Sequence, residues 1–469
     1  MTTTQTASTG SPAEAPSARP GAATVRLVAL AMGFVMATLD ATVVNVAGVS
    51  IKDRLDASLS QLAWVVDGYV LTFAAFLLLG GSLANRVGAK KAYSWGMGLF
   101  VLASLACGLA PSAETLIAAR LLQGVGAALF MPSSLTLLVL SFPDKAERAK
   151  MLGIWTAIVS TATGLGPVVG GVLVELLGWR SIFLLNLPLG LIGLVLTARL
   201  IPAPDPAPGT SAVTGHLLSF ATLAAACFAL IEGGSYGWTS AVILAAGAAA
   251  VLCGALFVAH ERRAGTPVIP RALYGDPRFS AANAIGFLLN VGLFGGSFML
   301  SLYLQQGRGA SPFAAGLQLL PVMAVILVGN LAFSRLSQKC SARSLLIAGF
   351  SVAAVCALAL VTVSATMPYW LLAGLMVIAN FCVGMIVPAL TASMMEAAGP
   401  QQANIAGAAL NANRQIGALV GIALMAVLLD GFDSVHRGAA ASFLVIGLAY
   451  ALSALLTWRF VRTPAETAA

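Results

Sequence analysis

Charged residues are scarce in this sequence of 469 residues, of which only 9% are Asp, Glu, Lys or Arg. Soluble domains carry about 25% charged residues, so most of the surface of this protein cannot face water. Histidine is also rare, and His216, His260 and His436 lie in different segments. The sequence has no spacing typical of metal ligands or of a nucleophile and its base, so we expect neither a metal site nor an enzyme.

Two further absences narrow the function. The six cysteines are scattered, with no CxxC or paired spacing, and this pattern supports neither a disulfide framework nor a zinc site. The phosphate-binding pattern Gly-x-x-x-x-Gly-Lys-Ser/Thr does not occur, so there is no sign of a built-in ATP motor. We therefore expect no cofactor.

Apolar residues make up 59% of the chain, and the mean hydropathy is +0.93. These values indicate that lipid is the main solvent of the protein. A helix needs roughly 20 apolar residues to cross the hydrocarbon core. We therefore predict an all-α membrane protein with fourteen transmembrane helices, near residues 27–48, 62–84, 92–110, 115–138, 151–174, 182–201, 215–232, 239–259, 279–304, 312–334, 344–364, 369–391, 404–429 and 440–461.

The basic residues set the expected orientation. They form short clusters between the apolar runs rather than one patch, so the net charge of +8 does not indicate a nucleic-acid partner. With both termini on one side, eighteen Lys and Arg residues lie on that side and five on the other. The positive-inside rule then places both termini in the cytoplasm of a cell-membrane protein. Residues 1–24 are rich in Thr, Ser, Ala and Pro and are expected to form a disordered cytoplasmic tail.

An internal repeat is visible in two loops. The segment Ser82–Lys90 aligns without gaps with Arg335–Arg343, at an offset of 253 residues. The same offset maps the first predicted span onto the ninth. We predict an N-terminal half of six helices (25–201), a linker with two inserted helices (202–260), a C-terminal half of six helices (261–462) and a short tail (463–469). Transporters built from paired repeats hold their substrate near the midplane, where the halves meet.

Ionisable residues inside the apolar runs are candidates for function, because each costs roughly 2.5–3.5 kcal/mol on insertion scales. Asp40 lies past the middle of the first span, and a carboxylate held out of water can exchange protons. Arg120 lies early in the fourth span and needs a partner, which is either Asp40 or Asp67. Asp67 is either a second proton relay or an interfacial residue in contact with water, and Glu232 lies near an interface.

Other polar and small residues indicate a cavity and a hinge. Arg414 in the thirteenth span, with Asn411 and Gln415, is expected to line the cavity. In the fifth span, glycines and a proline predict close helix packing and a kink, because proline removes a backbone hydrogen bond. These hinge residues are Gly153, Gly166, Pro167, Gly170 and Gly171.

These motifs resemble the major facilitator superfamily, and specifically its fourteen-helix drug:proton antiporter branch, over about residues 27–461. Leu39–Ala47 is similar to the first-helix motif of that branch, and Leu116–Ala128 to its fourth-helix motif. The resemblance implies a proton-coupling role for Asp40 and Arg120, with Asp67 as a further candidate. It also implies a substrate cavity, for which the candidate residues are Asn45, Gln123, Gln305, Gln306, Asn411 and Arg414.

The loop 81–90 resembles the gating loop of the family, with Asn85, Arg86, Gly88 and Lys90 as its candidate residues. The family usually has aspartate where Asn85 stands, and that carboxylate latches the cytoplasmic side shut. Because Asn85 carries no charge, we expect a weaker latch in the outward-open state.

The sequence thus predicts a major facilitator fold that exports amphipathic or hydrophobic small molecules, such as a drug, an antibiotic or a secreted metabolite, in exchange for protons. A lipid or nutrient carrier on the same scaffold is the alternative. The expected partners are a small-molecule substrate, protons and membrane lipid, and the protein is expected to be a monomer. The substrate's identity and the number of protons exchanged do not follow from the sequence.

Overall fold

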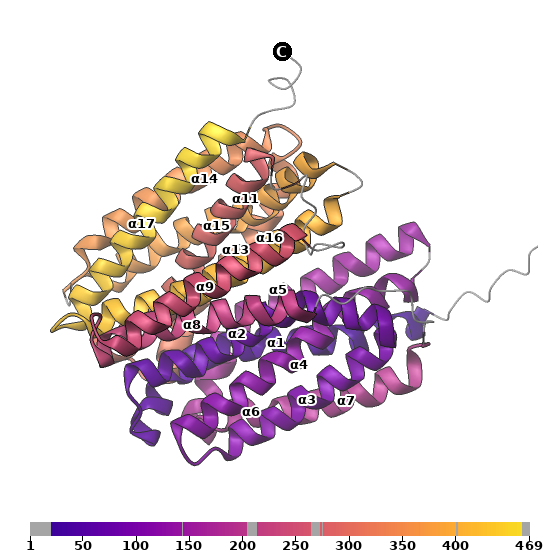
Figure 1. The fold of residues 1–469 in the computed structure, drawn as a ribbon, viewed down its shortest axis with the longest axis horizontal. Coiled ribbons are helices and arrows are strands. Elements are labelled where there is room, and N and C mark those ends of the chain that lie inside the picture. The colour runs from indigo at the N-terminus through magenta and orange to yellow at the C-terminus, as the bar shows by residue number, and fades with distance from the viewer. Residues whose placement is uncertain are drawn as a thin grey trace, which may run out of the picture.

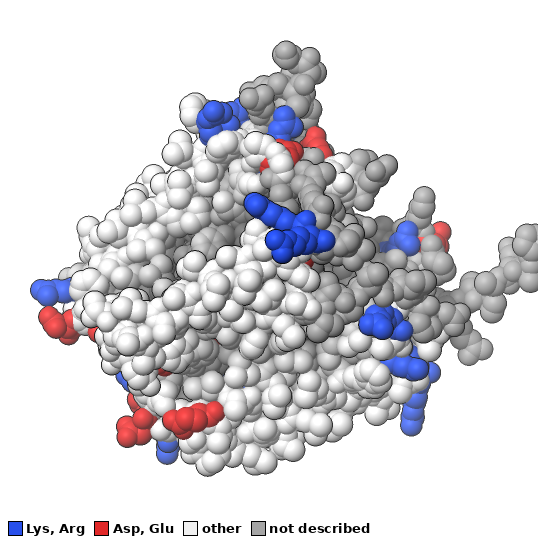
Figure 2. Space-filling model, in the orientation of Figure 1, with Lys and Arg blue, Asp and Glu red and all other residues white. Residues whose placement is uncertain are grey.

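The computed structural model describes residues 20–142, 144–203, 213–263, 273, 275–364, 366–399 and 402–461, and every regular element in these ranges is a helix. Fourteen of the helical segments are long and apolar enough to cross a membrane. The predicted fold class and number of spans are therefore confirmed. In Figure 2 the visible face carries a broad uncharged area, and charged side chains gather toward its borders, as a protein surrounded by lipid requires.

The N-terminal half contains α1 (Pro20–Leu55), α2 (Leu59–Val87), α3 (Ala89–Leu109), α4 (Ala113–Ser141), α5 (Lys145–Leu177), α6 (Ser181–Leu184) and α7 (Asn186–Leu200). The inserted pair is α8 (Val213–Tyr236) and α9 (Ala241–Arg263). The C-terminal half contains α11 (Pro277–Asn290), η1 (Val291–Gly295), α12 (Gly296–Leu302), η2 (Tyr303–Gly307), α13 (Pro312–Leu336), α14 (Ala342–Ala359), η3 (Leu360–Thr362), α15 (Tyr369–Ala398), α16 (Ala403–Asp430) and α17 (Val435–Phe460).

Polar residues at the helix starts set several of these boundaries. Ser58 caps α2 by accepting a hydrogen bond from the Gln61 backbone, and the Gln61 side chain accepts from the Ser58 backbone in return. This reciprocal pattern satisfies backbone donors that the first turn would otherwise leave unpaired. α11 and α13 each begin with a capping residue followed by proline, whose fixed φ suits the first helical position.

Two boundaries differ from the sequence prediction. α1 begins at Pro20, so the predicted tail already ends there and not at residue 24. Residues 1–19, residues 204–212 of the predicted linker and the tail 463–469 lie outside the described residues. The sixth span is split into α6 and α7, because Pro188 cannot donate the backbone hydrogen bond to Leu184 that a continuous helix needs.

The two halves form two bundles that lie side by side, with α8 and α9 between them (Figure 1). Equivalent helices pack alike in the two bundles: α3 packs on α4 and α7, as α14 packs on α15 and α17. Across the seam, α5 packs on α13 and α2 packs on α16. α8 packs on both α2 and α16 and so covers this part of the seam, whereas α9 packs mainly on α8.

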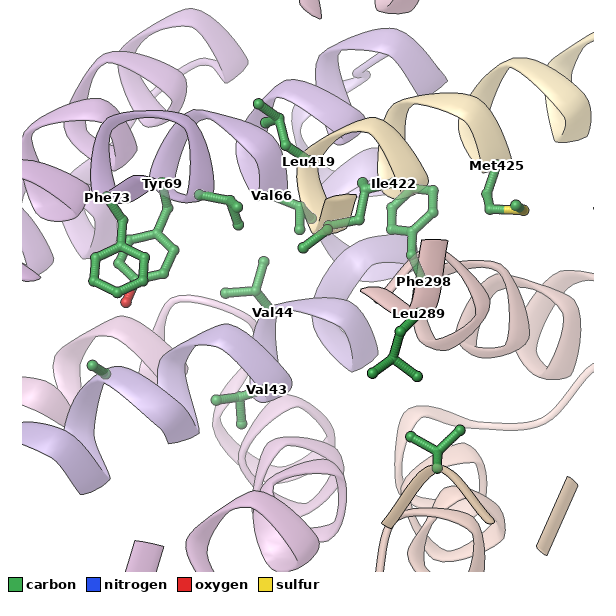
Figure 3. Packing of buried hydrophobic residues seen from close by; sticks show 14 of the residues in the cluster. Val43, Val44, Val66, Tyr69, Phe73, Leu289, Phe298, Leu419, Ile422 and Met425 are labelled. Carbon is green, nitrogen blue, oxygen red and sulfur yellow. The ribbon is translucent and has the colours of Figure 1, made fainter. Parts of the chain in front are cut away.

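The apolar core continues across the seam. Figure 3 shows Val44 of α1, Val66 of α2, Phe298 of α12 and Ile422 of α16 in one cluster, although they come from different halves. These side chains are all nearly inaccessible. The packing therefore holds the halves together around this region in the state that the structure shows.

Candidate functional site

Asp40 of α1 is the centre of a buried polar cluster within the N-terminal half. The residue is 1% exposed, and its carboxylate pairs with Nη1 of Arg120 on α4. Its Oδ1 accepts hydrogen bonds from Gln123 Nε2 at 2.9 Å and from Asn186 Nδ2 at 3.1 Å. Three side chains on two helices, α4 and α7, thus supply donors to one carboxylate, and bonds of this charge-assisted kind are stronger than those between neutral groups.

Arg120 is held as tightly as its partner. Its Nε donates to the Val65 carbonyl of α2 at 2.8 Å, and Nη1 also donates to Gln123 Oε1 at 2.7 Å. The guanidinium carbon lies 4.5 Å from the ring centroid of Tyr69 and 5.7 Å from that of Phe183. These contacts offset part of the cost of removing a cation from water. Of the two partners that the sequence left open for Arg120, the structure selects Asp40.

Ser104 and Asn186 complete the cluster and were not identified from the sequence. Ser104 Oγ of α3 accepts from Gln123 Nε2 at 2.9 Å and from Asn186 Nδ2 at 3.3 Å. Asn186 is the first residue of α7, directly after the break that Pro188 causes. The available signal in the sequence was Asn186 itself, a polar residue two positions before a proline within an apolar run.

Asp67 lies apart from this cluster. It is fully buried, so the expectation of an interfacial residue in contact with water is wrong. Neither carboxylate oxygen has a hydrogen-bond partner among the described residues. One turn earlier on α2, Trp64 Nε1 donates to Glu232 Oε1 of α8 at 3.0 Å, which ties the inserted pair to the N-terminal half. The carboxylate of Glu232 is therefore engaged in a contact between helices.

Two adjoining cavities lie between the halves. The first, which we call the vestibule, has a volume of about 740 Å³ and reaches Gly81 and Ser82 at the gating loop. The second, the central cavity, has a volume of about 350 Å³ and is deeper, with Tyr69, Asn290 and Arg414 in its wall. Phe34, Phe73, Met131 and Asn411 line both cavities. The volume of the central cavity lies in the range typical of small-molecule sites.

The other end of the seam is closed by contacts between the halves. Ser301 Oγ donates to the Asn45 carbonyl at 2.9 Å, and Gln305 Nε2 donates to the Val46 carbonyl at 3.0 Å. Nearby, Glu175 Oε2 accepts from Ser311 Oγ at 2.8 Å and from the Phe313 backbone at 3.0 Å. We call this set of contacts the seal. The structure is thus open at the gating loop and closed at the opposite end.

Glycines allow the close approach of helices at the seal. A Cβ on Gly316 of α13 would lie 2.4 Å from the Pro167 carbonyl oxygen of α5, and one on Gly171 would lie 2.6 Å from the Pro312 carbonyl oxygen. Gly166 and Gly170 face Thr42 and Val43 of α1 equally closely. Gly316 and Gly171 cannot be replaced by a larger residue without a shift of the backbone, whereas at Gly166 and Gly170 the side chains of Thr42 and Val43 would have to move first. Gly153 differs, because a Cβ there would meet nothing within 4 Å, so its predicted role in close packing is wrong.

The predicted cavity residues fall into two groups. Arg414 and Asn411 line the central cavity, and Asn45 lines only a smaller cavity of about 70 Å³ beside it. Gln123, Gln305 and Gln306 line none of these cavities, which corrects the expectation. Gln123 belongs to the Asp40 cluster, Gln305 to the seal, and Gln306 is exposed. A polar residue in a membrane span can either bind a neighbouring helix or line a cavity. The sequence alone does not distinguish these two roles.

The gating loop lies at the open end. Asn85 and Arg86 are exposed at the end of α2, and Gly88 has φ 94°, a conformation that favours glycine. Lys90 Nζ donates to the Ala198 carbonyl within the same half at 3.0 Å. Among the described residues, no hydrogen bond or ion pair joins these four residues to the other half, as expected for a loop on the open side.

A two-bundle helical protein with a central cavity and a buried ion pair in one bundle is a membrane transporter. Residues 30–422 match the model of the Major Facilitator Superfamily. The chain therefore belongs to this superfamily, in its fourteen-helix drug:proton antiporter branch.

Several relatives carry names that describe resistance. The chain is 55% identical to the methylenomycin A resistance protein of Streptomyces coelicolor over 95% of this chain and 94% of that protein. It is 52% identical to the methylenomycin A resistance protein of Bacillus subtilis, over 94% and 95% of the two chains. The multidrug resistance protein Stp of Mycobacterium tuberculosis is 35% identical over 87% of this chain and 76% of that protein.

Proposed function

We propose that this protein exports amphipathic small molecules from the cytoplasm across the cell membrane in exchange for protons, by alternating access. The observation that carries the proposal is Asp40, a carboxylate held out of water by donors from α4 and α7 beside a cavity between the halves. Relatives at 55% and 52% identity are named methylenomycin A resistance proteins, so this antibiotic is the first substrate to test.

Protonation of Asp40 is the proposed energy-coupling step. In the ionised state, Asp40 and Arg120 neutralise each other, and three further groups fix their geometry. A proton on Asp40 removes the negative charge and leaves the Arg120 cation buried without its partner. A buried charge that has lost its partner is strongly destabilising. We propose that this change favours a different packing of the helices around the cluster, in which the seal opens.

Tyr69 joins the cluster to the cavity. Its ring lies over Arg120 on one side and forms part of the wall of the central cavity on the other. It also stacks on Phe73, with ring centroids 6.0 Å apart. A substrate in the cavity therefore contacts a side chain that touches the ion pair. We propose that displacement of Tyr69 is how substrate binding and proton binding affect each other.

The membrane supplies the driving force. One charge moving down a potential of 100 mV releases about 2.3 kcal/mol, and one pH unit adds about 1.4 kcal/mol. In the proposed orientation both termini and the gating loop lie in the cytoplasm, so the structure is the inward-open state. Asp67, a second buried carboxylate, is proposed as a further proton site on α2.

The test is proton-gradient-driven transport of methylenomycin A in proteoliposomes, for wild type and Asp40→Asn. Asparagine keeps the size of the side chain and removes the exchangeable proton. We expect the wild type to build a substrate gradient that collapses with the pH gradient, and the variant to build none. Asp430→Asn, at the exposed end of α16, is the matched control and should retain transport.

The transport measurements test the role of Asp40, the role of Asp67 and proton exchange itself separately. Asp67→Asn, measured beside Asp40→Asn, reports whether the carboxylate of α2 also takes part. Transport that persists in Asp40→Asn and still depends on the pH gradient would falsify the coupling role of Asp40. Transport that needs no pH gradient in any variant would contradict proton exchange itself and favour a passive carrier.

A further inference from the structure

Arg414 is a cation without a counter-ion among the residues that the structure describes. It lies on α16, partly exposed in the wall of the central cavity, and within the same residues its Nε has no hydrogen-bond partner. The residues that line the central cavity and the vestibule include no other charged side chain. Asp40 does not compensate Arg414, because it is buried in its pair with Arg120. The described part of the transport path therefore carries one uncompensated positive charge.

The position of Arg414 is fixed by tight helix packing. A Cβ on Gly286 of α11 would lie 3.2 Å from Arg414 Cγ, so the side chain runs directly over the α11 backbone at a glycine. One turn further along α16, a Cβ on Gly417 would lie 2.2 Å from the Phe287 carbonyl oxygen. Two helices that pack this closely fix the backbone at Arg414 and the first part of its side chain, so the guanidinium starts from a defined position in the cavity wall.

The surroundings of Arg414 define the shape of a ligand. Asn411 and Gln415 of the same helix line the cavity and add amide donors beside the guanidinium. Asn290 Oδ1, also in the cavity wall, is a buried acceptor without a partner among the described residues. The rest of the wall includes the aromatic side chains Phe34, Phe73 and Phe294. The cavity thus combines one cationic end with an apolar body.

We propose that the preferred substrates of this transporter are amphipathic organic anions, of which the carboxylate or an equivalent acidic group binds Arg414 while the apolar body lies against the aromatic wall. The guanidinium matches a carboxylate in a bidentate geometry. This inference rests on the proposed function and names its substrate class. A cationic drug would meet the uncompensated charge of Arg414 at close range and is disfavoured.

An anionic substrate is compatible with proton exchange at Asp40. Because Asp40 is 1% exposed and lies behind Tyr69, the substrate's acidic group does not take its place beside Arg120. The two charges act at separate positions, one in each half. Coupling then passes through the packing of Tyr69 and the opening of the seal rather than through direct competition for one carboxylate.

The experiment compares three matched probes in proteoliposomes that contain the full-length protein: an amphipathic aryl carboxylate, its methyl ester and the corresponding primary amine. The variants are Arg414→Gln, Arg414→Lys and the control Arg437→Gln, which removes an exposed positive charge outside the cavity. Initial rates of pH-gradient-driven transport are measured against probe concentration. Acetate, which has the charge but no apolar body, is added as a competitor to detect a site for any small anion.

We expect the wild type to transport the carboxylate best and the amine least. Arg414→Gln should lower kcat/KM for the carboxylate roughly ten- to a hundredfold, as loss of a charge-assisted hydrogen bond does, and should change the ester less than threefold. Arg414→Lys should recover part of the loss, Arg437→Gln should behave as wild type, and acetate should not compete.

Other results overturn the inference. If the amine is transported best, or if Arg414→Gln lowers all three probes equally, Arg414 does not select anions. Effective competition by acetate means that the site binds small anions and not amphipathic acids. These results leave the proposed function intact as long as transport follows the pH gradient and is lost in Asp40→Asn. If none of the probes is transported in a preparation that exports methylenomycin A, the proposed substrate class is wrong.

Discussion

The two halves of the molecule repeat each other in helix packing but differ in what lies between equivalent helices. In the N-terminal half, α1, α2, α3, α4 and α7 enclose the cluster of Asp40, Arg120 and Gln123. In the C-terminal half the same place lies between η1, α13, α14, α15 and α17. It holds a small cavity of about 20 Å³, lined by apolar side chains such as Leu293, Met376 and Phe443.

This difference assigns separate tasks to the halves. The N-terminal half contains the buried carboxylate at which we propose that a proton binds. Among the described residues, the C-terminal half has no such pair at the equivalent place, and it contributes the cation Arg414 to the central cavity instead. Proton binding at Asp40 would therefore act directly on the packing of one bundle only. An asymmetric change of this kind is suited to rocking one half against the other.

The largest effect is expected when one member of the ion pair in the N-terminal half is removed. Arg120→Met leaves the Asp40 carboxylate buried without its cation, and such a change costs about 3–5 kcal/mol. We expect a clear drop in the thermal midpoint of the purified protein and no proton-driven transport. The double variant Asp40→Leu with Arg120→Met copies the apolar character of the C-terminal half, and replacement of a whole buried pair is often neutral or stabilising.

The double variant is therefore the control that separates folding from coupling. It should unfold near the wild-type temperature and still transport no substrate against a gradient. If Arg120→Met unfolds at the wild-type temperature, Asp40 does not depend on Arg120 as its buried counter-ion in the way that the structure indicates. If the double variant retains proton-driven export, the asymmetry between the halves does not carry the coupling.

The charged part of this comparison could be predicted from the sequence. Asp40 and Arg120 stand out because a charge in an apolar run is rare and costly, so each required a partner and a purpose. The fourteen spans were predicted because hydropathy reports the environment of a segment directly. The internal repeat was visible in the sequence as well, and spans that occur in the same order in the two halves pack against equivalent neighbours.

The neutral polar residues could not be assigned in the same way. Ser104 and Asn186 are common residue types in membrane helices, and only the meeting of α3, α4 and α7 shows that they bind one another. Gln305 was expected in the cavity but donates across the seam to α1. The sequence likewise could not show that Arg414 has no partner among the described residues. That result depends on which side chains the neighbouring helices place beside it.

A second prediction concerns the seal, where α5 of one half packs closely on α13 of the other. Gly316→Ala places a methyl group 2.4 Å from the Pro167 carbonyl oxygen, and neither backbone can give way without moving α5 from α13. We expect the closed seal to be destabilised and the population open on that side to rise. The measurement is the labelling rate of Thr42→Cys by a membrane-impermeant thiol reagent, applied from the side of the seal in a cysteine-free background.

Gly153→Ala is the matched control for this prediction, because it makes the same change on α5 with nothing within 4 Å of the added atom. Its labelling rate should equal that of the parent. Equal rates for Gly316→Ala and Gly153→Ala would mean that the close approach at Gly316 does not limit opening.

The smallest expected effect concerns the two loops that revealed the repeat. Asn85 is exposed on the open side of the N-terminal half, and Gln338 is its counterpart in the C-terminal half, exposed and bonded weakly to the Ser334 carbonyl at 3.4 Å. Asn85→Asp adds a carboxylate that can interact with a helix N-terminus when this side closes, a contribution of about 0.3–1 kcal/mol. The outward-open population should therefore rise by less than about sixfold, and labelling of Thr42→Cys should rise by the same factor.

Gln338→Glu adds an equal charge to the counterpart loop and serves as the control. If both variants shift the labelling alike, the added charge acts through the general field of this side, and the difference between the two loops has no part in the latch.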